Sequence, residues 1–131
     1  MSNSDLPIFT ALRTRMQWHQ ERQRVLAENV ANSDTPNFKP RDLVEPKFDS
    51  SGAAAGGTLA MVRTSAAHMG PSGAPETFNS TKGGFETRPA GNSVNLEDEM
   101  LKISQNQMDY EAVTGLYTRS LHLLKTAIGK A

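Results

Sequence analysis

Three prolines between Thr35 and Lys47 set the strongest limit on what this chain can fold into. Proline has no N–H to donate, and its ring biases the preceding residue away from the helical region. The stretch from Val25 to Asn32 spaces its apolar residues as a helix does, so the sequence predicts a helix that ends near Asn32. From Thr35 to Lys47 it predicts an extended elbow, with side-chain-mediated turns at Asn32 or Asp34.

The segment before the elbow has the pattern of a long amphipathic helix from about Leu6 to Asn32. Ser4 or Asp5 is the expected N-cap, and Pro7 suits the first turn, where a missing N–H costs little. A stripe of apolar and uncharged residues follows the three-four spacing of a heptad repeat. A helix of this length cannot bury such a stripe against itself, so it needs a partner. The predicted stripe comprises Phe9, Leu12, Met16, His19, Gln23, Leu26 and Val30.

The C-terminal segment repeats the pattern from Asn95 onward and provides that partner. Asn95 is the expected N-cap, and the acidic residues 97–99 suit the positive end of the helix dipole. Gly115 costs about 1 kcal/mol relative to Ala, and it is either tolerated on an exposed face or allows a neighbouring helix to approach. The predicted stripe comprises Leu96, Met100, Ile103, Gln107, Tyr110, Thr114, Tyr117, Leu121, Leu124 and Ile128. We therefore predict a mainly α fold whose terminal helices pair as an antiparallel, coiled-coil-like unit.

The middle of the chain has a different composition, because residues 52–91 hold eight of the ten glycines. Its few large apolar residues predict a poorly ordered or small β region. Thr58–Thr64 is a candidate strand, Glu76–Arg88 a candidate hairpin, and Ser50–Gly57 a candidate disordered loop. The predicted organisation is one structural unit: helix 1–32, elbow 33–49, middle region 50–93 and helix 94–131.

The composition argues against several classes of function. The 131 residues contain 14 basic and 14 acidic side chains and no cysteine, so no general nucleic-acid binder, disulfide framework or thiolate site is expected. His19, His68 and His122 lack metal-ligand spacing, and the helix dipole is a sufficient explanation for the acidic residues 97–99. No apolar run is long enough to span a bilayer, and no cleaved secretory signal is expected. We predict no enzymatic activity, metal or cofactor.

Residues 26–43, LAENVANSDTPNFKPRDL, resemble the signature of the bacterial flagellar axial proteins. In that signature, an Ala-Asn-hydrophobic-Ala-Asn segment precedes a Thr-Pro dipeptide and an aromatic-Lys pair. Asn37 stands where many relatives carry Gly, so it must tolerate any positive φ, as Asn does better than most residues. Residues 65–67 replace a more polar segment of the family. The stretches that resemble its proximal rod members are Asp34–Pro36, Phe38-Lys39, Arg41–Leu43, Val62–Thr64 with His68-Met69, and Gly91–Glu97 with Tyr110.

The resemblance implies a structural subunit of the flagellar basal-body rod, next to the MS ring, that transmits torque. It implies export by the flagellar type III apparatus without signal cleavage. The implied partners are copies of the chain, other rod proteins of the FlgC, FlgF and FlgG type, the adaptor FliE and the MS ring. The resemblance implies that the chain binds no nucleic acid and has no membrane-spanning segment. The elbow is expected to wedge against a neighbour through Asn29, Asn32, Asp34, Thr35, Pro36, Phe38, Lys39, Arg41 and Asp42.

Two other interpretations remain open at this point. One is another axial component, such as the second proximal rod protein. The other is a cytosolic helical-hairpin adaptor that binds a partner protein, because two amphipathic helices joined through a thin middle region suit either role.

Overall fold

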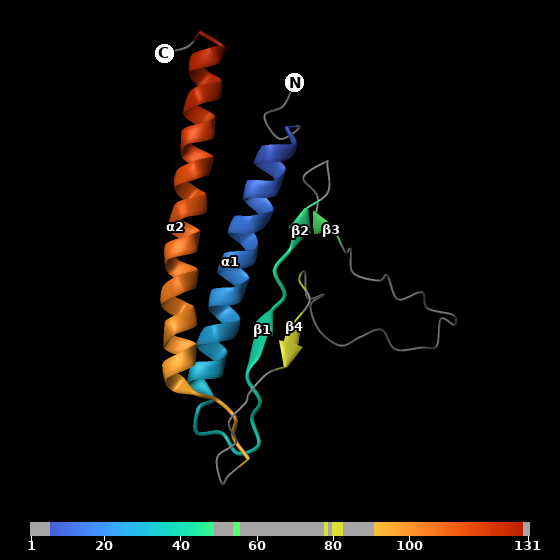
Figure 1. Cartoon of the computed structure of the whole chain (residues 1–131), viewed down its shortest axis with the longest axis vertical. Helices are drawn as coiled ribbons and strands as arrows, with labels where there is room; N and C mark the ends of the chain where they lie inside the picture. Colours follow the sequence, from blue (N-terminus) through green and yellow to red (C-terminus); the bar gives the residue numbers. More distant parts are fainter. Residues whose placement is uncertain (1–5, 49–53, 56–77, 79, 83–90, 130–131) are drawn as a thin grey trace, which may run out of the picture.

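The computed structural model describes residues 6–48, 54–55, 78, 80–82 and 91–129. Two long helices lie side by side, and short strands border the first of them (Figure 1). The predicted mainly α architecture is therefore confirmed. The elements are α1 (Pro7–Ala31), β1 (Arg41–Leu43), β2 (Lys47–Phe48), β3 (Ala54–Ala55), β4 (Ser80–Lys82) and α2 (Leu96–Ala127).

The two helices are antiparallel. At one end of α1 the ring of Phe9 meets Tyr117 edge-on, with centroids 5.7 Å apart. Near the other end Asn29 Nδ2 donates to Glu99 Oε2 at 2.9 Å. Rising residue numbers in α1 thus meet falling numbers in α2. The C-terminal part of α2 extends beyond the start of α1 (Figure 1).

The ends of α1 lie within one residue of the predicted bounds. Leu6 occupies the N-cap position without a side-chain hydrogen bond, and Pro7 lies in the first turn. The expected caps Ser4 and Asp5 lie outside the described residues. At the other end the Glu28 carbonyl oxygen accepts two hydrogen bonds from Asn32, one from its backbone N–H at 3.1 Å and one from its Nδ2 at 2.8 Å, which closes the last turn of the helix.

Helix α1 buries two faces, of which the sequence predicted one. On the predicted stripe Phe9, His19 and Leu26 are buried, and the other four residues are half-buried. A second face carries Trp18 and Val25, seven residues apart, and packs away from α2. These two side chains form a cluster with Leu43 of β1 and Phe78. The sequence-based prediction missed this face because a heptad pattern assigns one packing stripe to each helix.

The face that α2 turns toward α1 differs from the predicted one near both helix ends. Glu99, Asn106 and Val113 are its buried residues, whereas Leu96, Met100 and Ile128 are exposed. The polar residues face α1 because Asn29 and His19 bond them there. The predicted stripe residues that are half-buried are Ile103, Tyr110, Thr114, Tyr117, Leu121 and Leu124, and Gln107 is exposed.

The strands pair in two short antiparallel ladders. β1 pairs with β4 in the register Arg41↔Lys82, and β2 pairs with β3 in the register Lys47↔Ala55. Ala54–Ala55 is therefore a strand, although residues 50–57 were predicted to be a disordered loop. Within the candidate hairpin of residues 76–88, Ser80–Lys82 forms β4, which pairs with β1. The prolines keep residues 41–48 extended, which leaves backbone groups available for this pairing. The predicted strand at residues 58–64 lies outside the described residues.

The N-cap of α2 yields a stability prediction. Asn95 Oδ1 accepts hydrogen bonds from the N–H groups of Glu97 at 3.0 Å and Asp98 at 3.4 Å. Asn95→Ala should lower the free energy of unfolding by about 1 kcal/mol, because these N–H groups lose their acceptor. Urea denaturation followed by circular dichroism measures the change. Ser104→Ala, at an exposed position inside α2, should stay within ~0.5 kcal/mol of the unmodified chain. Equal losses in both variants would contradict the capping role.

Candidate functional site

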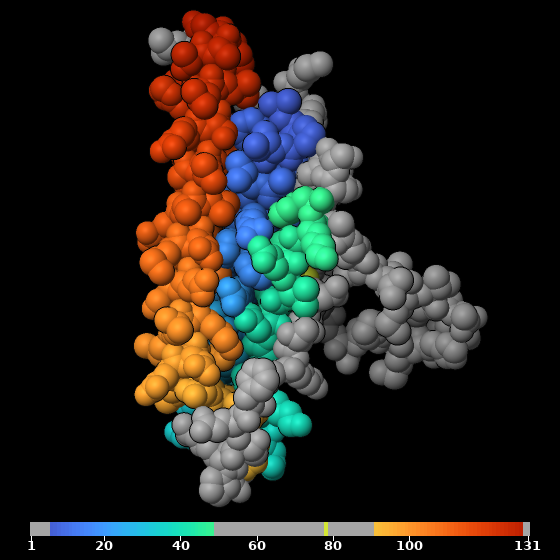
Figure 2. Space-filling model, in the orientation of Figure 1, coloured from blue at the N-terminus to red at the C-terminus, as the bar shows by residue number. Residues whose placement is uncertain are grey.

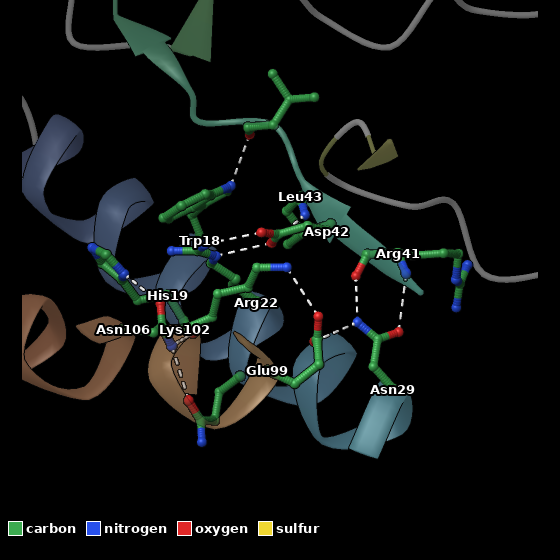
Figure 3. Close-up of polar contacts among 12 residues, drawn as sticks. Trp18, His19, Arg22, Asn29, Arg41, Asp42, Leu43, Glu99, Lys102 and Asn106 are labelled. Atoms are coloured by element: carbon green, nitrogen blue, oxygen red, sulfur yellow. Dashed lines mark hydrogen bonds and ion pairs between the residues drawn. The ribbon is translucent and has the colours of Figure 1, made fainter. Parts of the chain in front are cut away.

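Asn29 joins three elements of the fold at one carboxamide. Its Nδ2 donates to the carbonyl oxygen of Arg41 at 2.6 Å and to Glu99 Oε2 at 2.9 Å. Its Oδ1 accepts the N–H of Arg41 at 3.0 Å. The Asn29 side chain thus pairs with Arg41 as a neighbouring strand would, and at the same time it contacts α2 (Figure 3). The residue is buried, so each of these bonds replaces water that cannot reach the site.

Glu99 is a carboxylate with only 2% of its surface exposed. Asn29 reaches one carboxylate oxygen, and Lys102 Nζ donates to the other at 2.9 Å. Lys102 is half-buried one helical turn along α2. Burying a charge is costly unless it is paired and hydrogen-bonded, and Glu99 has both kinds of partner. This residue therefore fixes where α2 sits against the end of α1.

Two consecutive turns follow α1. The N–H of Thr35 donates to the Asn32 carbonyl oxygen at 3.1 Å, and the N–H of Phe38 donates to the Thr35 carbonyl oxygen at 3.3 Å. In the second turn Pro36 occupies the first central position, and Asn37 occupies the next with φ 58°. A positive φ at that position is the mark of a type II turn. Residues 32–37 therefore form a compact turn, where an extended chain had been predicted from Thr35, and the extended backbone starts only after it.

The segment before α2 is hydrogen-bonded to these turns. Asn92 Nδ2 donates to the carbonyl oxygens of Asn32 at 2.9 Å and Thr35 at 2.6 Å, and its Oδ1 accepts the N–H of Val94 at 2.9 Å. The N–H of Ser93 donates to the Phe38 carbonyl oxygen at 3.1 Å. The turn after α1 and the entry to α2 are thus one hydrogen-bonded unit, which we call the stapled elbow (residues 29–43 with 91–99).

Ion pairs on the outer side of α1 hold β1. Arg22 meets Asp42 through two hydrogen bonds of 2.9 Å each, and the Asp42 carboxylate raises the pKa of Arg22 above its usual value. The Arg22 guanidinium carbon also lies 5.3 Å from the centroid of the Trp18 ring. Arg41 pairs with Glu28 at 3.2 Å. Both predicted polar contacts of the elbow at residues 41 and 42 are therefore engaged inside the subunit.

Trp18, the single tryptophan of the chain, packs on α1 beneath the extended segment and contacts it at residues 43 and 44. Its Nε1 donates to the Val44 carbonyl oxygen at 2.8 Å, while its ring is 4% exposed. Sequence reasoning missed this residue and also missed Glu99 and Asn92. For Trp18 the available signal was its seven-residue spacing from Val25 on a face with no predicted partner.

A second buried polar layer lies further along the helix pair. Asn106 Nδ2 donates to the His19 carbonyl oxygen at 2.9 Å and to Gln23 Oε1 at 3.0 Å, and its Oδ1 lies 2.7 Å from His19 Nδ1. The amide oxygen can only accept, so Nδ1 carries the proton. Among the residues described, His19 Nε2 is the buried side-chain atom without a hydrogen-bond partner. A layer of this kind fixes the register of two helices.

The remaining predicted elbow residues lie at the surface of the turn. Asp34, Thr35, Pro36 and Lys39 are exposed, and Phe38 is half-buried. Within the described part of the chain, no group of three or more His, Asp or Glu side chains could hold a metal ion. The same residues include no helix that is both long and apolar enough to cross a membrane. The geometry presents a fixed, solvent-facing turn.

The Asn29 contacts predict a large effect of substitution. Asn29→Ala should lower the free energy of unfolding by roughly 3 kcal/mol, because it removes three hydrogen bonds to the backbone of Arg41 and to the buried carboxylate of Glu99. Asn29→Asp should also destabilise, since it places a second carboxylate beside Glu99. Glu99→Gln in the Asn29→Asp background should recover part of that loss. Chemical denaturation measures all three, with exposed Gln17→Ala as control. A cost for Asn29→Ala equal to that of Gln17→Ala would refute the role.

Gly91 predicts a second effect. Its φ is +75°, and a Cβ there would lie 2.3 Å from Asn37 Oδ1. Gly91→Ala should cost about 1–2 kcal/mol through backbone strain alone, with the clash in addition. Adding Asn37→Gly should remove the clash and leave the strain, so the double variant should be more stable than Gly91→Ala. Thermal unfolding tests this order, and a double variant no more stable than Gly91→Ala would contradict it.

Comparison with known proteins identifies the group to which this chain is similar. The family model for the flagella basal body rod protein matches residues 10–39, which span most of α1 and the turn after it. The flagellar basal body rod protein FlgB of Agrobacterium fabrum is 31% identical over 125 residues, 92% of this chain and 91% of that protein. FlgB of Bacillus subtilis is 27% identical, with 82% and 81% covered, and FlgB of Escherichia coli 28%, with 70% of each covered. The family match runs from α1 into the stapled elbow, and the chain belongs to the flagellar basal body rod protein family, together with relatives named FlgB.

Proposed function

We propose that this chain, a structural subunit of the flagellar basal-body rod by family, occupies the proximal part of the rod and passes torque from the MS ring. The observation that carries the proposal is the position of the family match. Residues 10–39 include most of α1 and the turns that Asn32, Thr35 and Asn92 hold together. A shaft under torque needs joints that do not flex, and this joint is hydrogen-bonded to both helices.

The surface of the turn is the proposed contact with a neighbouring subunit. Asp34, Pro36 and Lys39 are exposed there, whereas Arg41 and Asp42 are engaged with α1. Lys39 is therefore the basic residue of the predicted set that is positioned to meet a carboxylate on a neighbour. Asn29 and Asn32 would act indirectly, by holding the turn in place.

The proposed partners and the proposed route to the rod are those that the sequence resemblance implies. We propose contacts with copies of the chain, with rod proteins of the FlgC, FlgF and FlgG type, with the adaptor FliE and with the MS ring. Export would use the flagellar type III apparatus without signal cleavage, which places the subunit in the periplasmic rod. A rod subunit of this kind would have no catalytic activity.

Location tests the proposed function directly. A small tag inserted at residues 56–57 of a chain that still supports swimming should co-purify with detergent-extracted basal bodies. In sub-assemblies that retain the MS ring but lack the distal rod, a proximal subunit should still be present. A tag found wholly in the cytosolic fraction of swimming cells would overturn the rod assignment and favour an adaptor role.

The turn surface predicts a separation of assembly from folding. Pro36→Ala, Phe38→Ala and Lys39→Glu should reduce swimming and incorporation into basal bodies, while the helicity of the free subunit stays nearly unchanged, because all three residues lie outside the helices. Lys47→Glu is the matched control for Lys39→Glu, since Lys47 is an exposed lysine on β2, away from the turn. A large loss of helicity in the turn variants, or equal defects in the two lysine variants, would contradict the proposal.

A further inference from the structure

The face of α2 that points away from α1 carries exposed apolar residues. Leu101, Met108, Leu116 and Leu123 are 69%, 63%, 51% and 63% exposed. Every other described element lies on the opposite side of α2, which forms one edge of the molecule (Figures 1 and 2). With Ala112 these residues form a stripe about 33 Å long, at 1.5 Å per residue. We call it the outer stripe of α2.

The outer stripe has a symmetry in its spacing. Leu101, Met108, Ala112, Leu116 and Leu123 follow one another at intervals of seven, four, four and seven residues. Reversing the helix direction about Ala112 exchanges Leu101 with Leu123 and Met108 with Leu116. Two copies of α2 placed antiparallel, with a two-fold axis at Ala112, would therefore set each large apolar side chain against another. A self-complementary surface of this kind is what an isologous dimer requires.

Charges beside the stripe favour the antiparallel orientation. Exposed Glu97, Asp98 and Asp109 lie beside its N-terminal half, and exposed Arg119 lies within its C-terminal half. Antiparallel pairing sets the acidic half of one copy against the basic half of the other. Parallel pairing would set like charges together, which is unfavourable.

The centre of the stripe is narrow. Ala112 is exposed, and at neighbouring Gly115 an added methyl group would meet no atom within 4 Å. Small residues let two helices approach toward the 8 Å end of the ~8–10 Å range of interaxial distances. The glycine that weakens the isolated helix thus lies where a second helix would come closest.

We propose that two copies of this chain pair through the outer stripes of α2, antiparallel and about a two-fold axis at Ala112. The proposal is independent of the rod assignment. A two-fold contact closes on itself and cannot extend into a shaft, so the pair is a form of the free subunit. It covers the outer stripe in the free subunit, and a single-helix contact of this size gives a weak, reversible dimer that can release its subunits.

Cysteine cross-linking tests the axis, because the chain has no cysteine of its own. Under mild oxidation the purified Ala112→Cys chain should form a covalent dimer at least about tenfold faster than Ala27→Cys, a matched exposed alanine on α1, because pairing raises the local thiol concentration. Gln105→Cys should cross-link no faster than the control, since the antiparallel pair holds its two copies roughly 20 Å apart. Equal rates for Ala112→Cys and Ala27→Cys would overturn the dimer, and fast cross-linking at Gln105→Cys would overturn its antiparallel orientation.

A charge exchange provides a second test. The two-fold axis sets Gln105 opposite Arg119 of the second copy. In sedimentation equilibrium Gln105→Lys should raise the dimer Kd about fivefold, because two symmetric repulsions arise, and Gln105→Glu should lower it by a similar factor. Adding Arg119→Glu to Gln105→Lys should restore the original Kd. A chain that is monomeric at every concentration, or a Kd unaffected by these changes, would overturn the dimer, and neither result would affect the location test of the rod assignment.

Discussion

The Asn29 carboxamide is the contact on which the arrangement of the chain depends. Its two polar atoms match the N–H and the carbonyl oxygen of Arg41, and its second N–H reaches Glu99. An aspartate has no donor for the carbonyl group, and an apolar residue would remove all three of these hydrogen bonds. A single side chain thus fixes β1 to α1 and α1 to α2. The ends of the helix pair, the turn and the first strand meet at this point.

The turn after α1 is held by a similar use of asparagine. Asn32 caps the helix, Asn37 accepts the positive φ of a type II turn, and Asn92 binds the carbonyl groups of residues 32 and 35. Asn32 and Asn92 thus bind backbone carbonyl groups at the helix end and in the turn, and Asn37 adopts a backbone conformation that few other residues tolerate. The polar composition that limits the hydrophobic core therefore has a structural purpose, because it specifies one backbone path through the elbow.

The helix interface combines polar layers with few apolar contacts. Asn106 and Glu99 face α1, while Leu101 and Met108 face solvent. Buried polar groups fix register more than they add stability, and exposed apolar residues on the outer side leave α2 available to a neighbour. This distribution is suited to a family whose members are rod subunits, and the two-fold pairing proposed for the free chain would occupy the same face of α2.

The sequence by itself determined the two helices, the end of α1 near Asn32 and the antiparallel pairing. The helices and their ends depend on local properties, namely heptad spacing, an N-cap at Asn95 and prolines that stop a helix, and the matching apolar stripes of the two helices predicted that they pair. Periodicity could not reveal that α1 buries a second face through Trp18, or that α2 turns Glu99 and Asn106 inward and Met100 outward. A buried polar residue needs a particular partner, and the partners lie 70 and 87 residues away in the chain. Only the tertiary structure brings such pairs together, because burial of a polar group is favourable only where its hydrogen bonds are completed.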